Sequence, residues 1–169
     1  VGTLQNNGSA VEVDSVTFKE GGTNFTNSLL VGTDSTGTLD AATGNTGVGT
    51  NVFAALTSGD DNTAVGLNAL KSNTTGYNLV AVGSSALCSN TTGSQSVAIG
   101  LKASCSNTEG FKNVAIGQCA LLNNTTGDQH VAIGVDALKA NTTSGTNTAV
   151  GFEAMVSTTT GFGTAVGYG

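Results

Sequence analysis

A glycine recurs at every seventeenth position along most of this chain, and it directly follows Val or Ile each time. The last of the nine glycines comes one position early, after a step of sixteen. Seventeen residues are too few for paired-helix repeats, which need about 33 residues, or for leucine-rich repeats, which need about 20 or more. They are enough for short strands joined by turns. The repeat glycines are Gly32, Gly49, Gly66, Gly83, Gly100, Gly117, Gly134, Gly151 and Gly167.

The residues around each glycine have the pattern of a strand and a turn. Segments such as Val114-Ala-Ile116 alternate large and small side chains, as a strand with one buried face does. Later in the unit, segments such as Asn73-Thr-Thr-Gly76 combine residues that favour turns. We predict an all-β fold, a parallel β-roll or β-solenoid of about nine 17-residue coils over residues 28–169, and leave its handedness open.

Alternation along the strand suggests which side chains form the core. We expect the Val or Ile before each glycine to point into the coil and to stack into a buried aliphatic ladder. This predicted core ladder contains Val31, Val48, Val65, Val82, Ile99, Ile116, Ile133, Val150 and Val166.

The small residue between the two large ones would then point outward. A flat column of alanines leaves room for another backbone, so we interpret it as a contact between chains of a homo-oligomer. The alternative is that small residues merely suit a tightly wound coil. The predicted inter-chain face contains Ala64, Ala81, Ala98, Ala115, Ala132 and Ala149.

Composition limits the function classes. The chain has only 9% charged residues, a net charge of −6 and no Arg, so it lacks the basic patch that nucleic-acid binding requires. No apolar run approaches the 18 or so residues of a membrane span, which argues against membrane insertion. Because 38% of the residues are hydrophobic, disorder is not expected either.

The sequence suggests no catalytic, cofactor-binding or metal-binding residues. The single histidine, His130, stands in a column otherwise held mainly by Asn or Ser, which we expect to face outward, and we assign it a structural role. Carboxylates such as Asp61, Glu109 and Glu153 are scattered over different columns. An enzyme that cleaves polysaccharides would need paired carboxylates, and no such pair recurs.

Cys88 and Cys105 occupy one column in adjacent coils, five residues after their repeat glycines. Stacked coils would place their Cα atoms about 4.8 Å apart, within the range of a disulfide. Parallel neighbours aim their Cβ atoms the same way, however, which strains a bridge. Two free thiols are therefore favoured over a bridge, and Cys119 in another column is expected to be exposed.

Residues 1–27 precede the repeats. The segment from Val11 to Phe18 alternates and predicts a strand, so we interpret residues 1–27 as a β segment that caps or connects the array. The last repeat stops two residues after its glycine, which suggests a piece of a longer fibre.

The strand motif Asn113-Val-Ala-Ile-Gly117 resembles the head repeats of trimeric autotransporter adhesins, whose repeats are usually shorter. The longer unit from Asn62 to Gly76 is similar to repeats in tail-fibre and other structural proteins of marine and cyanobacterial phages. The segment from Leu29 to Gly49 also looks like the start of such phage arrays. The resemblance implies a homotrimeric fibre of stacked β coils over about residues 28–169.

By this resemblance the expected function is the shaft of a phage tail fibre or similar virion appendage that reaches a host surface. Its partners would be two further copies of the chain and a host-surface glycan or protein receptor. The alternative is a bacterial cell-surface adhesin or an extracellular filament. A further hypothesis, ice binding, follows from recurring Thr74 and Thr75, but adjacent threonines in a strand face opposite ways, and the flanking Asn and Gly mark a turn.

Overall fold

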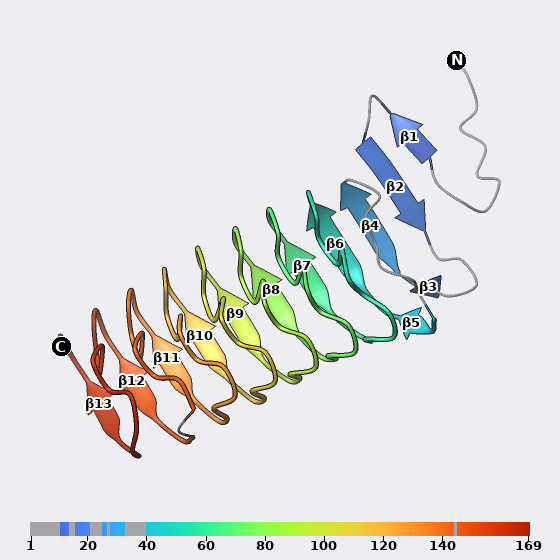
Figure 1. The fold of residues 1–169 in the computed structure, drawn as a ribbon. Helices are drawn as coiled ribbons and strands as arrows, with labels where there is room; N and C mark the ends of the chain where they lie inside the picture. The colour runs from blue at the N-terminus through green and yellow to red at the C-terminus, as the bar shows by residue number, and fades with distance from the viewer. Residues whose placement is uncertain (1–10, 14–15, 21–24, 27, 33–39, 144) are drawn as a thin grey trace.

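The computed structural model describes residues 11–13, 16–20, 25–26, 28–32, 40–143 and 145–169. All regular secondary structure within these ranges is β. Nine short parallel strands, β4 and β6–β13, lie side by side in chain order and make about eight turns of a β-solenoid (Figure 1). The strands are β4 (Leu29–Gly32), β6 (Thr46–Gly49), β7 (Thr63–Val65), β8 (Val80–Val82), β9 (Val97–Ile99), β10 (Val114–Ile116), β11 (Val131–Ile133), β12 (Thr148–Val150) and β13 (Thr164–Val166).

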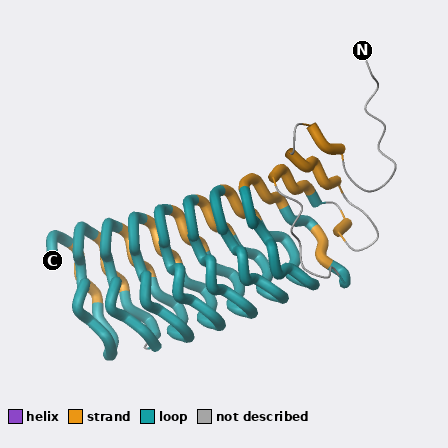
Figure 2. Tube along the Cα trace, turned by 45° about the horizontal axis from the view of Figure 1, so that its top comes forward, coloured by secondary structure: helices purple, strands orange, loops and turns teal. Residues whose placement is uncertain are grey.

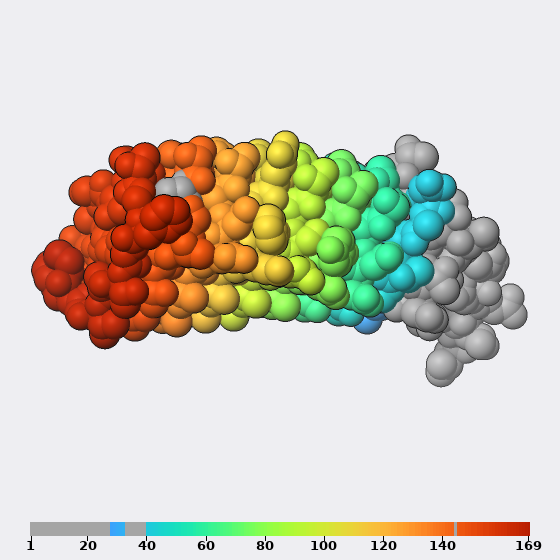
Figure 3. All heavy atoms as spheres, turned by 90° about the horizontal axis from the view of Figure 1, so that it is seen from below, coloured from blue at the N-terminus to red at the C-terminus, as the bar shows by residue number. Residues whose placement is uncertain are grey.

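The parallel pairing keeps the repeat in register. Val97 pairs with Val114 and Ala98 with Ala115, and the same step of one repeat relates the other neighbours up to β12. The strands form one wall of each coil, and loops and turns form the rest (Figure 2). Coils follow one another along a rod in sequence order (Figure 3). The all-β parallel solenoid predicted from the glycine spacing is therefore confirmed.

An antiparallel pair precedes the stack. Strand β1 (Val11–Val13) pairs with β2 (Val16–Glu20), which pairs in turn with β4. The prediction of a single strand from Val11 to Phe18 is thus wrong, because Val13 pairs with Val16 and the two halves run in opposite directions. Two shorter strands, β3 (Phe25–Thr26) and β5 (Ala42–Thr43), form a separate parallel pair.

Left-handed backbone conformations bend each coil. In the coil that follows β7, Asn68 has a φ of 59°, Leu70 of 49° and Asn78 of 54°, and the equivalent residues of later coils repeat these values closely. Such conformations are uncommon outside glycine. Three of them per repeat turn the chain sharply enough to close a coil within a single repeat. Leu70 is buried nonetheless, so stacking on neighbouring coils fixes this conformation.

The core consists of small strand residues packed against Ala-Leu pairs on the opposite wall. Ala98 and Ala115 are completely buried, as are Ala120 and Leu121 across the coil. Gly47 occupies the same column, and a Cβ there would lie 2.8 Å from Leu30 Cδ1 and 2.9 Å from Val52 Cγ1. The space inside a coil is therefore narrow, and the strand contributes alanine because a larger side chain does not fit.

The predicted orientation of the strands is wrong. The proposed core ladder faces outward: Val65 is 37% exposed, Ile99 39% and Val166 77%. The alanines proposed as an inter-chain face line the interior instead, all at 0% exposure: Ala64, Ala81, Ala98, Ala115, Ala132 and Ala149. The prediction placed the larger residue inside, whereas the limited width of so short a coil requires the smaller one there.

The repeat glycines lie where successive coils approach most closely. A Cβ added to Gly100 would lie 2.5 Å from the carbonyl oxygen of Gly117 in the next coil, and the φ of Gly100 is +135°. Both the close approach and the positive φ exclude a side chain. This explains why glycine recurs at the end of every strand.

Replacing Gly100 by Ala is expected to lower the free energy of unfolding by about 3 kcal/mol or more, since it adds a backbone clash to conformational strain. Gly167 provides a matched control, because its φ is also +135° but no atom lies within 4 Å of an added Cβ. Gly167→Ala should therefore cost only the strain, about 1–2 kcal/mol. Urea denaturation of both variants tests this, and equal losses would contradict the steric explanation.

Candidate interaction surface and internal ladders

The outer side of the parallel sheet carries many exposed apolar side chains, interspersed with polar ones such as Thr63 and Gln118. We call it the outer face, and it consists of three columns: the residues three before, one before and one after each repeat glycine. In β9 these are Val97, Ile99 and the following Leu101, and Leu101 is 46% exposed. The most exposed large apolar members are Leu29, Val48, Val65, Leu67, Ile99, Leu101, Ile133, Val135, Phe152, Val166 and Tyr168.

The dimensions of the outer face follow from strand geometry. Nine parallel strands about 4.8 Å apart give a length of roughly 38 Å, and five residues along a strand give a width of roughly 13 Å. The whole face, polar positions included, has an area of about 500 Å², and apolar patches of a few hundred Å² on soluble monomers are often interaction sites. The third column, which includes Leu67 and Val135, was missed in the sequence because these residues follow the glycine that ends the strand pattern.

A ladder of buried asparagines runs through the interior. The amide Nδ2 of Asn90 donates to Oδ1 of Asn73 at 2.9 Å, and Asn107 and Asn124 repeat this bond to the preceding coil at 2.8 and 2.9 Å. Each Nδ2 also donates to the carbonyl oxygen of the glycine three residues later, as Asn107 does to Gly110 at 3.0 Å. We call Asn73, Asn90, Asn107 and Asn124 the asparagine ladder. These residues are fully buried.

A second buried polar column lies just before each strand, and it contains His130. Except at Leu79, which interrupts the column, a side-chain acceptor receives the backbone N–H of the equivalent residue in the next coil. Asn113 Oδ1 accepts from the His130 N–H at 2.9 Å, and His130 Nδ1 accepts from the Asn147 N–H at 3.2 Å. Because Nδ1 accepts, the imidazole is neutral with its proton on Nε2. The expectation that this column faces outward is wrong, since His130 is 0% exposed.

The recurring threonines serve the stack itself. Thr74 Oγ1 donates to the carbonyl oxygen of Thr91 at 3.0 Å, and Thr91 makes the same bond to Thr108. The neighbouring column, which begins with Thr75, is exposed but includes Glu109. One threonine column is thus used to join coils and the other is interrupted, so neither offers the regular exposed array that ice binding requires.

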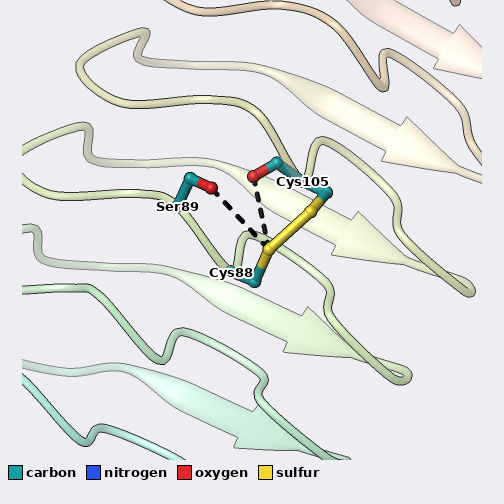
Figure 4. Close-up of a disulfide and its surroundings, with 3 residues drawn as sticks. All are labelled: Cys88, Ser89 and Cys105. Atoms are coloured by element: carbon teal, nitrogen blue, oxygen red, sulfur yellow. Dashed lines mark hydrogen bonds between the residues drawn. A yellow bond between two sulfur atoms is a disulfide. The ribbon is translucent and has the colours of Figure 1, made fainter.

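Cys88 and Cys105 form a disulfide between adjacent coils (Figure 4). Their Cα atoms lie 5.0 Å apart, close to the separation expected from stacking. The sequence favoured two free thiols, and the structure corrects this. Ser89 Oγ lies 3.8 Å from Cys88 Sγ, which also lies 3.5 Å from the carbonyl oxygen of Cys105. Cys119 is a free thiol that is half-buried rather than exposed.

Reducing the disulfide is expected to destabilise the stack. A bridge that closes a 17-residue loop contributes roughly 3 kcal/mol by restricting the unfolded chain. The Cys88→Ser, Cys105→Ser double variant should therefore melt at a lower temperature, and Cys119→Ser should not. Alkylation of the denatured protein should label one thiol before reduction and three afterwards. Labelling of three thiols without reductant would show that the bridge does not form.

Candidate metal ligands do not cluster in the described ranges. No three His, Cys, Asp or Glu side chains there lie close enough to hold a metal ion together. The same ranges contain no helix long and apolar enough to cross a membrane. One ion pair joins neighbouring positions of a turn, with Lys139 Nζ 3.2 Å from Asp136 Oδ1.

Together, the stacked coils and internal ladders define the chain as a β-solenoid repeat protein with an exposed aliphatic sheet face. Comparisons with protein-family models, with curated proteins and with solved structures find no match.

Proposed function

We propose that the chain is a structural shaft segment of a phage tail fibre or similar virion appendage, which supports attachment to a host surface. The outer face is the observation that carries this proposal. A rod needs no exposed aliphatic sheet for its own stability, because its interior is already filled by alanine, leucine and asparagine. Such a face is best explained by lateral contact with other rods.

The proposed partners on this face are two further copies of the same chain. Three rods with their outer faces turned toward a common axis would bury Val, Ile and Leu side chains, and apolar area removed from water contributes about 25 cal/mol per Å². The trimer follows from the resemblance to trimeric fibre repeats. It replaces the alanine contact expected from the sequence, since those alanines are interior.

The disulfide supports a location outside the cell. Disulfides persist in oxidising surroundings and are rare in the cytosol. The bridge between Cys88 and Cys105 therefore suits a virion appendage. It equally suits a bacterial cell-surface adhesin or an extracellular filament, which remains the second candidate function, with a host glycan or protein as the receptor in either case.

Light scattering coupled to gel filtration tests the assembly. We expect the unaltered chain to have three times the mass of a single chain. Lysines introduced at Ile99 and Ile133 on the outer face should reduce this to a single chain that keeps its β circular dichroism. The matched control places lysines at Gln95 and Gln129, which are exposed but lie outside the outer face, and should remain trimeric. A monomeric unaltered chain would overturn the proposal.

A further inference from the structure

Aromatic and small polar residues alternate along one corner of the stack. The column eleven residues after each repeat glycine contains, in successive coils, Asp60, Tyr77, Ser94, Phe111, Asp128, Gly145 and Phe162. Tyr77 is 45% exposed and Phe111 is 39% exposed, whereas Ser94 between them is buried at 7%. Within the column, Tyr77 and Phe111 are separated by one coil that carries no protruding side chain, and a third ring, Phe162, lies three coils beyond Phe111.

Hydrogen bonds explain why only the rings protrude. Ser94 Oγ accepts from the backbone N–H of Tyr77 at 3.2 Å, and Asp128 Oδ1 accepts from the N–H of Phe111 at 2.8 Å. Asp60 does the same for Thr43 at 2.8 Å. Each of these polar side chains bends back toward the preceding coil and accepts a backbone hydrogen bond from it. The side chains of Tyr77 and Phe111 accept no such hydrogen bond from the preceding coil, and their rings protrude from the corner.

A row of polar side chains runs beside the rings. The next column contains Asn78, Gln95, Lys112 and Gln129, all exposed and all held by the same left-handed backbone conformation, with φ of 54–58°. Lys112 Nζ lies 5.4 Å from the centroid of the Phe111 ring, so one side of that ring is next to an ammonium group. The side-chain amides of Asn78, Gln95 and Gln129 each offer both a donor and an acceptor, and Lys112 offers donors only.

From this geometry we propose a binding site for an extended, β-linked polysaccharide that runs along the rod axis. Sugar rings stack their C–H faces on aromatic rings, and their hydroxyls hydrogen-bond to amides. Tyr77 and Phe111 are two coils apart, a separation of about 9.6 Å. This is close to the length of one disaccharide in an extended β-linked chain, in which alternate sugars face the same way.

The spacing favours a polysaccharide over other polymers. Side chains on one face of an extended peptide repeat about every 6.6 Å, which does not match the two rings. A nucleic acid would need a basic surface, and the chain has a net charge of −6. Glycan binding at this corner is independent of the shaft proposal, because none of these residues belongs to the outer face.

Titration calorimetry of the intact chain with the hexasaccharides of β-1,4-linked N-acetylglucosamine and of β-1,4-linked glucose tests this inference. We expect at least one of them to bind, and Tyr77→Ala and Phe111→Ala each to lower the affinity about tenfold, since each removes one stacking platform. The α-linked glucose hexasaccharide, which curves, should bind at least tenfold more weakly. Phe152→Ala is the matched control, because Phe152 is 44% exposed but belongs to the outer face and not to this column, so the affinity of this variant for the sugar should be unchanged.

Three results would overturn the site: no binding of either β-linked sugar, an equal loss in Phe152→Ala, or full affinity in the Tyr77→Ala, Phe111→Ala double variant. Circular dichroism and light scattering on the same samples distinguish a failure of the glycan site from a failure of the shaft proposal. A monomer that binds sugar refutes only the trimer, and a trimer that binds none refutes only the glycan site.

Discussion

Replacing Ala98 by Asp is expected to destroy cooperative folding of the central coils, whereas the same replacement at the adjacent Ile99 should leave them folded. The two residues are consecutive in β9 but face opposite ways, with Ala98 at 0% and Ile99 at 39% exposure. A carboxylate at position 98 would be buried without a partner, at a cost of about 3–5 kcal/mol. It would also overfill a column in which only a methyl group fits.

Thermal melts followed by circular dichroism measure this difference. Ala98→Asp should lose the cooperative transition, and Ile99→Asp should keep one while disfavouring association through the outer face. Ala98→Gly serves as a control, since it adds no atom and glycine already occupies this column at Gly47, and it should melt only slightly earlier. If Ile99→Asp were the variant that unfolded, the strand would have to face the other way.

Asn107→Asp should be the most damaging isosteric change in the molecule. Asn107 Nδ2 donates to both Asn90 Oδ1 and Gly110 O, at 2.8 and 3.0 Å. A carboxylate of the same shape has no proton to donate at neutral pH, so both bonds would become repulsive contacts in a buried site. Since each buried group left without its bond costs about 1–3 kcal/mol, the free energy of unfolding should fall by at least about 3 kcal/mol.

Asn123→Asp provides the comparison, because Asn123 is exposed and lies just before the next residue of the asparagine ladder, Asn124. Substitutions at such sites usually change stability by less than about 0.5 kcal/mol. Denaturant titration of the two variants at pH 7 measures both values. A small effect at Asn107 would show that the asparagine ladder contributes little to stacking.

The sequence predicted the repeat and the parallel stack because both follow from spacing. It did not predict which side of each strand is buried. Alternation of Val97, Ala98 and Ile99 defines two faces, but choosing between them requires the width of the coil. That width depends on how Leu87 and Leu121, on the opposite wall, fill the interior, and this is a property of the closed coil rather than of the strand.

The internal polar residues show the same limit. Asn73 and its equivalents were assigned to turns from their composition, which is correct locally but omits their bonds to neighbouring coils. His130 was placed outward because it replaces Asn in a column thought to be solvated. Buried polar side chains are disfavoured unless each bond is satisfied, and only the stacked structure shows that equivalent residues one repeat apart satisfy one another.

The disulfide has a mechanical consequence for a rod that is pulled from its ends. Coils held only by hydrogen bonds can peel away one at a time, and each would release one repeat of slack chain. The covalent bridge between Cys88 and Cys105 prevents the repeat that it encloses from being extended by the applied force, and that repeat would span roughly 60 Å as extended chain. The fully stretched molecule is shorter by that amount until the bridge is reduced, and tension reaches the coils beyond it without passing through the loop.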